Sequence, residues 1–397
     1  MKQTYLDWAA TTPIDREIAE TMLRDQLDYP GNPSSRHALG YQARDYLEEA
    51  RAHTAALLGF PKPEPSHKAR LVFTGGGTES NSIPLLAQLR KKRRGRLLIS
   101  AIEHASVYEL APVFRDLGYE VRELKPDSSG RVDPRTVAAE LNEETIAVAL
   151  MLVNNETGAI QDIAATAALI RDYEKKIGRH IHFHCDAVQA LGKIPLNYPS
   201  LSVDSMAFSA HKIRGPRGVG LLWCSGDLVS LSSGGGQEAG LRPGTENIAG
   251  AWAMVHGMEK SLTSLEENFK HAAGLRDHFY EAIDEIPGVT PFPEERRELQ
   301  EFFSPYILAV SIAPVPGEVM ARVLDDRGFA VGTGSACSSG QKKKAGRVAR
   351  AMGAPEETAQ SLLRVSTGPG TSFEELDRFL DTFRQELKFL QHTVRRR

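Results

Sequence analysis

The sequence predicts an α/β fold: a mostly parallel central sheet covered by helices on both faces forms a large domain, and a small α+β domain accompanies it. Up to about Leu262, short apolar runs typical of buried strands alternate with amphipathic stretches typical of helices, and this order favours a parallel sheet. After about Pro287 the pattern becomes a shorter mixture of helices and strands. With 397 residues, the chain is long enough for two domains with substantial cores.

The first predicted strand, residues 71–73, leads into a glycine-rich turn, residues 74–80, and then into a helical segment that extends to about Arg90. Glycines let the backbone approach a phosphate closely, and the free N–H groups at a helix start favour an anion. Turns of this kind are also common without a phosphate ligand. The turn alone therefore favours a phosphate site only weakly.

The elements that follow continue the alternation. Asp133 suits a helix N-cap and Pro134 the first helical position, so we expect a helix from there through Leu141. A long apolar run then predicts a strand over residues 146–153. Three more strands and a long helix are expected over residues 181–183, 205–208, 219–223 and from Ile248 past Leu262.

Polar side chains follow two of these strands. After residues 181–183, the Asp186 carboxylate could pair with a protonated pyridine nitrogen, and the Gln189 amide could bond a phenolic oxygen. After residues 205–208 comes Lys212, and a lysine at a strand end beside phosphate-binding groups is how enzymes hold pyridoxal phosphate as a Schiff base. A lysine considered alone is more often a solvated surface residue. The lysine, the acid and the phosphate turn together predict a pyridoxal-phosphate site.

Further motifs extend from about Tyr5 to about Phe373. They occupy residues 5–7, 10–13, 31–35, 103–104, 154–156, 184–189, 209–212, 242–245, 334–337 and 364–366. With them the chain resembles the cysteine desulfurases, a branch of the class V aminotransferase family that uses pyridoxal phosphate. The resemblance implies pyridoxal-phosphate fold type I, which is aspartate-aminotransferase-like. It also implies a large cofactor domain, residues 14–262, and a small domain, residues 1–13 and 263–397, that carries the catalytic cysteine.

The resemblance also implies roles for individual residues. Lys212 is expected to hold the cofactor and to act as the base at the substrate Cα. His104 is expected to end a strand, to stack on the ring and to assist proton transfer. Asp186 is expected at the ring nitrogen and Gln189 at the phenolic oxygen. The phosphate is expected to be held by Gly77, Thr78, Ser209 and His211, with Thr245 of the partner subunit, which implies a homodimer. The substrate carboxylate is expected to meet Asn32, Asn155, which also contacts the cofactor, and Arg364.

Cys337 lies in a glycine- and serine-rich stretch, residues 332–340, and three lysines follow at Lys342, Lys343 and Lys344. Such a stretch is expected to be mobile and exposed, and the lysines favour a thiolate. Composition alone also allows an incidental loop cysteine. The resemblance, however, places a persulfide-carrying cysteine here, so we expect the Cys337 thiolate to take sulfur from L-cysteine and leave L-alanine.

The spacing between Cys337 and Arg364 is 27 positions (364 minus 337). In the family that the chain resembles, this longer spacing marks the branch that serves iron–sulfur cluster assembly and thiolation of transfer RNA. We therefore expect the persulfide to pass by thiol exchange to a sulfur-acceptor protein, such as an iron–sulfur scaffold or a tRNA-thiolation relay.

Three other functions stay open. A selenocysteine lyase or a β-eliminating cysteine lyase would release its product without a persulfide on Cys337. An ordinary aminotransferase would cycle through the pyridoxamine form and need a keto-acid acceptor. A non-catalytic sulfur-relay or docking subunit would not need Lys212, Asp186 and His104, which are all present.

Composition restricts the remaining possibilities. Mixed-sign charge with a net value of -3 argues against a nucleic-acid partner. Neither a membrane-spanning run nor a signal-peptide core is evident, and three cysteines suit a reducing compartment, so a cytoplasmic location is expected. Cys185 and Cys224 are expected to be buried structural thiols. No metal is expected, because Asp186, which shares a strand face with His182 and His184, serves better as a pyridine partner.

Overall fold

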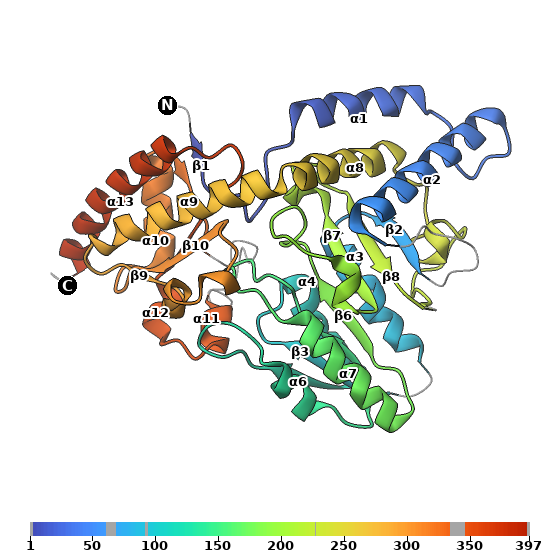
Figure 1. Cartoon of the computed structure of the whole chain (residues 1–397), viewed down its shortest axis with the longest axis horizontal. Helices are drawn as coiled ribbons and strands as arrows, with labels where there is room; N and C mark the ends of the chain where they lie inside the picture. The colour runs from blue at the N-terminus through green and yellow to red at the C-terminus, as the bar shows by residue number, and fades with distance from the viewer. Residues whose placement is uncertain (1–2, 61–68, 92–93, 227, 334–345, 395–397) are drawn as a thin grey trace.

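The computed structural model describes residues 3–60, 69–91, 94–226, 228–333 and 346–394 (Figure 1). Its main feature is a seven-stranded sheet in which only β8, among the described strands of that sheet, runs against the others. In order across the sheet the strands are β2 (Arg70–Thr74), β8 (Gly220–Cys224), β7 (Ser205–Ser209), β6 (His182–Asp186), β5 (Thr145–Ala149), β3 (Arg96–Ser100) and β4 (Glu120–Leu124). The mostly parallel central sheet is therefore confirmed.

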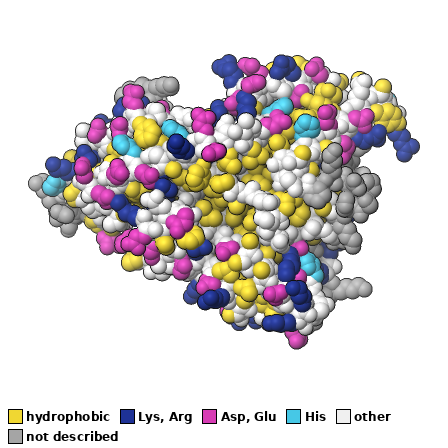
Figure 2. Space-filling model, viewed as in Figure 1, with side chains coloured by type: hydrophobic (Ala, Val, Ile, Leu, Met, Phe, Trp, Pro, Cys, Tyr) yellow, Lys and Arg dark blue, Asp and Glu magenta, His cyan; other side chains and the backbone are white. Residues whose placement is uncertain are grey.

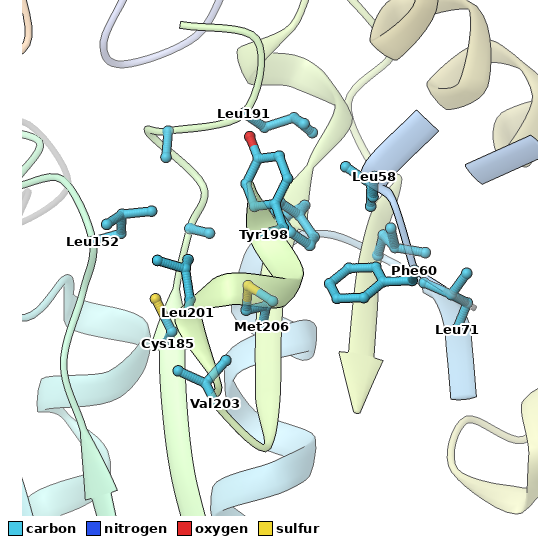
Figure 3. Close-up of a cluster of buried hydrophobic side chains, with 14 of the residues drawn as sticks. Leu58, Phe60, Leu71, Leu152, Cys185, Leu191, Tyr198, Leu201, Val203 and Met206 are labelled. Atoms are coloured by element: carbon cyan, nitrogen blue, oxygen red, sulfur yellow. The ribbon is translucent and has the colours of Figure 1, made fainter. Parts of the chain in front are cut away.

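Helices cover both faces of this sheet, because successive side chains of a strand point to opposite faces. On β3, Leu98 joins a core made with α2 (Ala38–Leu58), α6 (Pro134–Glu140), α7 (Ile163–Ile177) and α8 (Ile248–Thr263). Leu97 and Ile99 join a core made with α3 (Gly77–Leu86), α4 (Ala105–Tyr108) and α5 (Leu110–Asp116). Figure 3 shows part of the first core, where Cys185 and Met206 pack among apolar side chains. The remaining described helix of this part is α1 (Arg16–Asp28). Short 3₁₀ turns add η1 (Ala87–Arg90), η2 (Tyr198–Leu201), η3 (Ala210–Lys212) and η4 (Glu238–Gly240).

A second, smaller unit combines the start of the chain with its last part. Its core includes Leu6 near the N-terminus together with side chains from Leu275 to Leu387. Its strands are β1 (Thr4–Tyr5) with β11 (Phe329–Ala330), and β9 (Thr290–Pro291), β10 (Ile307–Ser311) and β12 (Leu362–Ser366). Its helices and turns are α9 (Leu265–Asp284), η5 (Glu294–Arg297), η6 (Gln300–Phe302), α10 (Gly317–Asp326), α11 (Arg347–Ala351), α12 (Glu356–Gln360) and α13 (Phe373–Val394). The exact division at residues 14 and 262 stays a prediction.

Local signals in the sequence account for most of these elements. The Asp133 side chain accepts a hydrogen bond from Arg135 N at 2.7 Å and caps α6, as predicted. The predicted strand over residues 146–153 is too long, because β5 ends at Ala149. Beyond that point the N–H groups of Leu150 and Leu152 still donate to carbonyls of β6, so the segment stays buried beside the sheet after the regular ladder ends.

The surface carries both signs of charge. In Figure 2, Lys and Arg side chains are interspersed with Asp and Glu over the part with the large sheet and over the smaller unit. Hydrophobic side chains gather where these two parts meet. Within the described ranges, no helix is both long enough and apolar enough to cross a membrane.

Candidate active site

The ends of three parallel strands bring the predicted cofactor residues to one edge of the sheet. β2 ends at Thr74 before the glycine-rich turn, β6 ends at Asp186, and β7 ends at Ser209. A Cβ built on Gly77 would lie 3.4 Å from the Ser209 Cβ. Ligands in open α/β sheets bind outside the carboxyl ends of the strands, so this edge is the candidate site.

The glycine-rich turn presents hydrogen-bond donors at the start of α3. Gly76 is the N-cap and has a positive φ of 146°, which suits glycine, and it provides no side-chain cap for the first N–H groups of the helix. Ser209 Oγ is buried and has no partner within the part of the chain that the structure describes. Gly77, Thr78 and Ser209 therefore surround a place that favours an anion.

Lys212 lies in η3, directly after β7, and its ammonium contacts the start of the chain. Nζ donates to the carbonyl oxygens of Ala9 at 2.6 Å and Ala10 at 2.7 Å. The adjacent His211 contacts Thr11 Oγ1 through Nδ1 at 3.1 Å. Burial, followed by the nearby Lys212 charge, lowers the pKa of His211 to about 4, so its ring is neutral at pH 7. The N-terminal segment thus forms one wall of the site through its backbone.

Asp186 accepts hydrogen bonds on both carboxylate oxygens. Asn81 Nδ2 donates to Oδ2 at 2.8 Å and Val188 N donates to Oδ1 at 3.0 Å. Gln189 is fixed in turn, since its Nε2 donates to Ala9 O at 2.8 Å and its Oε1 accepts from Lys193 Nζ at 2.7 Å. Both predicted ring partners are therefore held in defined orientations.

The sequence predicts that His104 ends a strand, and this prediction is wrong, because β3 ends at Ser100. Instead, His104 is the N-cap of α4, and its Nδ1 accepts from Ser106 N at 3.1 Å. Burial lowers the pKa of His104, the charge on Asp186 opposes this shift, and the charge on Lys212 adds to it. His104 therefore lies within electrostatic reach of both residues with which it is expected to work.

Arg364 is buried on β12 and already has two partners. Its Nη2 forms an ion pair with Asp7 Oδ1 at 2.7 Å, and its Nη1 donates to the Asn155 carbonyl at 2.8 Å. Gly332 pairs with the Arg364 backbone through hydrogen bonds in both directions. Arg347, on the other side of the cysteine segment, donates to the carbonyls of Ala101 and Glu103. Cys337 and the three lysines lie outside the described residues, but these contacts place residues 332 and 347 beside the site.

Asn32 and Thr245 are not brought to Arg364 or Lys212 by any described contact. Both are exposed, and Asn32 Oδ1 accepts from Ser34 N within its own turn. Gln237 Nε2 donates to Ser34 Oγ at 3.3 Å, which places this turn beside the loop that leads to Thr245. The two residues therefore lie near one exposed surface.

Comparison with known proteins assigns the chain to a family. The model of the family described as Aminotransferase class-V matches residues 4–379. The chain belongs to the class-V aminotransferases. Relatives of this class-V aminotransferase include the "NifS/IcsS protein homolog" of Lactobacillus delbrueckii subsp. bulgaricus, which is 36% identical over 384 residues covering 96% of each chain. The "Cysteine desulfurase IscS" of Dictyoglomus turgidum is 34% identical over 395 residues, or 98% of this chain and 96% of that protein.

Solved structures give the same relationship. A "NIFS-LIKE PROTEIN" superimposes with a TM-score of 0.86 at 32% identity and covers 98% of this chain and 100% of its own. DndA from Streptomyces lividans superimposes with a TM-score of 0.73 at 32% identity. The match covers 92% of this chain and 100% of DndA. The predicted family and pyridoxal-phosphate fold are thereby confirmed.

The class-V aminotransferases use pyridoxal phosphate, and the residues at this sheet edge fit that cofactor. Ser209 Oγ, which has no partner among the described residues, and the start of α3, which has no side-chain cap, offer donors for the phosphate. A Cβ on Gly77 would lie 3.0 Å from Val188 Cγ2, so any larger residue would crowd the segment after Asp186 and push it aside by a few tenths of an ångström. Lys212, Asp186 and Gln189 would supply an amine for the Schiff base, an acid for the ring nitrogen and an amide for the phenolic oxygen.

Sequence reasoning missed several residues of the site. Asp7 lies in one of the motifs, but nothing near it in the sequence points to Arg364. The carbonyls of Ala9 and Ala10 were missed because backbone contacts leave no side-chain signature. Lys193 was missed because a lysine is usually exposed. Here burial, with smaller contributions from Lys212 and Arg364, lowers the pKa of Lys193 to about 7. Asn81 was missed because nothing local to α3 points to Asp186.

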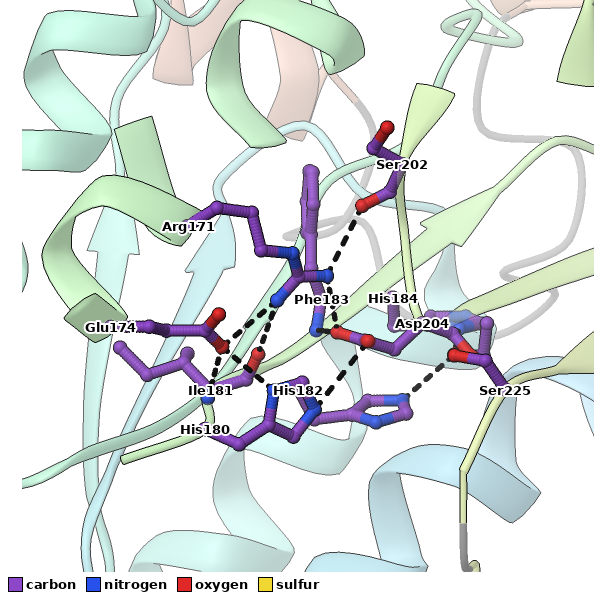
Figure 4. Close-up of polar contacts among 11 residues, drawn as sticks. Arg171, Glu174, His180, Ile181, His182, Phe183, His184, Ser202, Asp204 and Ser225 are labelled. Atoms are coloured by element: carbon purple, nitrogen blue, oxygen red, sulfur yellow. Dashed lines mark hydrogen bonds and ion pairs between the residues drawn. The ribbon is translucent and has the colours of Figure 1, made fainter. Parts of the chain in front are cut away.

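The strand face that suggested a metal site is used by hydrogen bonds. His182 Nε2 and His184 Nδ1 each contact Ser205 Oγ at 2.8 Å. Another group, His180, His182 and Asp204, places possible ligand atoms within 4.8 Å of one another. Arg171 Nη2 donates to Asp204 Oδ2 at 2.8 Å (Figure 4). This guanidinium supplies the positive charge that a metal would bring.

Proposed function

We propose that this class-V aminotransferase is a pyridoxal-phosphate-dependent cysteine desulfurase, which converts L-cysteine to L-alanine and leaves the sulfur as a persulfide on Cys337. The observation that carries the proposal is the meeting of Lys212, Asp186 and His104 at one sheet edge, while Gly332 next to Arg364 leads into the cysteine segment. The names of the two relatives and the resemblance of the motifs support the same activity.

When bound, pyridoxal phosphate supplies an electron sink for negative charge at the substrate Cα. Lys212 removes the Cα proton through Nζ, and the carbonyls of Ala9 and Ala10 orient that nitrogen. Arg364 binds the substrate carboxylate, and Asp7 holds the guanidinium plane in place from one side. His104, neutral because it is buried, moves a proton near the ring.

The Cys337 thiolate then attacks the sulfur of the substrate. A sulfur–sulfur bond forms, the substrate Cβ–S bond breaks, and the carbon fragment takes up protons and leaves as alanine. No outside oxidant or reductant is needed, since the sulfur is transferred between two organic partners. A thiol of a sulfur-acceptor protein, such as an iron–sulfur scaffold or a tRNA-thiolation relay, removes the outer sulfur later.

The proposal includes a homodimer that acts in the cytoplasm. Four apolar side chains on α1 and at the start of α2 are at least two fifths exposed: Leu23 63%, Leu27 70%, Leu39 49% and Tyr41 43%. They belong to the part of the chain that carries the Asn32 turn, which lies near Thr245. A second copy on this surface would cover them and bring its Thr245 toward the phosphate site.

Product analysis of the cofactor-loaded protein with L-cysteine, with and without a reductant, tests the proposal. We expect alanine and sulfide in equal amounts, and a protein persulfide that is absent from Cys337→Ala. Cys224→Ala is the matched control and should keep the persulfide, because burial raises the pKa of that thiol to about 12. Pyruvate and ammonia would instead indicate a β-eliminating lyase, and turnover at the wild-type rate in Cys337→Ala would refute the persulfide route.

A further inference from the structure

A chain of buried polar side chains ends at Asp186, although none of its other members has a role in the proposed reaction. It consists of His182, Ser205, His184 and Asn81, which come from β6, β7 and α3 and are each at most 4% exposed. The contacts along it are His182 Nε2 to Ser205 Oγ at 2.8 Å, Ser205 Oγ to His184 Nδ1 at 2.8 Å, His184 Nε2 to Asn81 Oδ1 at 2.9 Å, and Asn81 Nδ2 to Asp186 Oδ2 at 2.8 Å.

Chemistry fixes the direction of every hydrogen bond in this chain. An amide oxygen only accepts, so His184 Nε2 must carry a hydrogen where it meets Asn81 Oδ1. Burial lowers the pKa of His184 to about 3, and its ring is therefore neutral with a bare Nδ1. The Ser205 hydroxyl must donate to that nitrogen, and it accepts in turn from His182 Nε2.

The same logic decides which way the Asn81 amide faces. Because Oδ1 is taken by His184, the amino group of Asn81 faces Asp186 Oδ2 and Ser106 Oγ, each at 2.8 Å. A flipped amide would set its oxygen against the Asp186 carboxylate, whichever tautomer His184 adopts, and that contact would be repulsive. In the observed orientation His184 Nε2 donates to Oδ1 on the opposite side, so the two neighbours together hold the amide in one orientation.

The consequence for Asp186 is that, among the described residues, both of its oxygens accept from N–H donors. Asn81 donates to Oδ2 and Val188 N donates to Oδ1 at 3.0 Å. Each carboxylate oxygen keeps a second lone pair, and the N–H donors at Oδ1 and Oδ2 favour negative charge on the group. An amide also cannot pass a proton from one side to the other, so the chain sets hydrogen-bond direction and does not conduct protons.

We propose that Asn81, oriented by His184, is a positioning residue that keeps Asp186 a pure hydrogen-bond acceptor and so places the proton shared with the cofactor on the ring nitrogen. This inference deepens the proposed function and rests on it for the identity of the reaction. It assigns to His184 a role through Asn81 only, since His184 itself meets Asn81 and Ser205.

The test is the protonation state of the ring nitrogen in the holoenzyme, read by ¹⁵N NMR after loading with ¹⁵N-labelled pyridoxal phosphate. The decisive pair is His184→Leu and His184→Gln, because glutamine can still donate to Asn81 Oδ1 whereas leucine cannot. We expect the wild-type, protonated signal in His184→Gln and a shift toward the unprotonated signal in His184→Leu and Asn81→Leu. Ser82→Ala, next to Asn81 on α3, is the control and should match the wild type.

Turnover provides the second readout. We expect kcat for alanine formation to fall about 10- to 100-fold in both leucine variants, the usual scale for residues that orient a reactive group, with KM for L-cysteine nearly unchanged. Wild-type ring-nitrogen signals in both leucine variants would overturn the inference. If the wild type forms no alanine, the desulfurase proposal fails, whereas the NMR comparison still decides the role of Asn81 because it needs no substrate.

Discussion

At the scale of single residues, Glu103 shows how burial can change the charge of a group beside the site. Its Oε1 accepts from Ser100 Oγ and Met151 N, each at 2.6 Å, and its Oε2 is buried without a partner among the described side chains. Burial is the main reason that the pKa of Glu103 rises to about 8, and the charge on Asp186 adds to the rise. Glu103 is therefore mostly neutral at pH 7. Its two hydrogen bonds join the end of β3 to the segment after β5.

This raised pKa predicts a specific dependence of stability on pH. Between the ordinary pKa of 4.5 and about 8, the folded protein keeps a proton that the unfolded chain has released. Folded stability therefore decreases through that window as pH rises. Glu103→Gln lacks the effect. We therefore expect the thermal midpoint of this variant, measured relative to that of the wild type, to rise from pH 5 to pH 8.5 by an amount equivalent to a few kcal/mol at most. The control is Glu120→Gln on the surface, and parallel curves for Glu103→Gln and wild type would contradict the assignment.

At the scale of helices and strands, close backbone approach decides where a glycine is required. Gly317, the first residue of α10, packs so tightly against β12 that an added Cβ would overlap the Leu362 carbonyl oxygen. Gly274, in the middle of α9, would meet only the edge of Phe373, at 3.3 Å. Phe373 is 43% exposed and can move aside.

Two matched substitutions test this difference. We expect Gly317→Ala to destabilise the protein by about 1–3 kcal/mol, because the small sheet must shift to admit the methyl group. Gly274→Ala should leave stability unchanged or raise it by up to about 1 kcal/mol, because alanine favours a helix interior. Urea unfolding of the two variants beside the wild type makes the comparison. Equal losses of stability in both variants would show that the contact with Leu362 does not set the cost.

At the scale of the whole molecule, the proposed dimer gives the exposed apolar side chains of α1 a purpose. α1 packs along α8 (Figure 1). Its residues Leu23 and Leu27, one helical turn apart, are 63% and 70% exposed. Exposed apolar residues scattered singly are normal in proteins. These lie near the exposed Asn32 turn and the Thr245 loop, both of which are expected to serve the site.

A charge placed on this surface tests the dimer. We expect the double variant Leu23→Glu with Leu27→Glu to halve the mass measured by light scattering and to lose cofactor affinity, because each site would lack the partner's Thr245. The control is Val113→Glu on α5 with Leu117→Glu at its C-cap, since these side chains are 42% and 46% exposed. A monomeric wild type, or an unchanged mass in the α1 variant, would remove the dimer from the proposal.

The sequence by itself determined the local features of this protein. Periodicity placed five of the seven described strands of the central sheet and missed the bounds of β3 and β4. Asp133 and Pro134 marked the start of α6, and the motifs around Lys212 and Asp186 marked two strand ends of the site. Such signals depend on neighbours a few residues away, and they are legible in the order of the residues. They were least reliable where a chain segment remains buried after its ladder ends, as beyond Ala149, and where a side chain lies past a strand end, as at His104.

Tertiary structure alone decided which of these features meet. Asn81 reaches Asp186 across 105 positions and Arg364 reaches Asp7 across 357, and neither partner marks the other in the sequence. Burial of Lys193 and Glu103 likewise follows from what packs over them, and burial sets the charge that each carries. Pairing and dielectric environment belong to the packed chain, and local residue patterns do not record them.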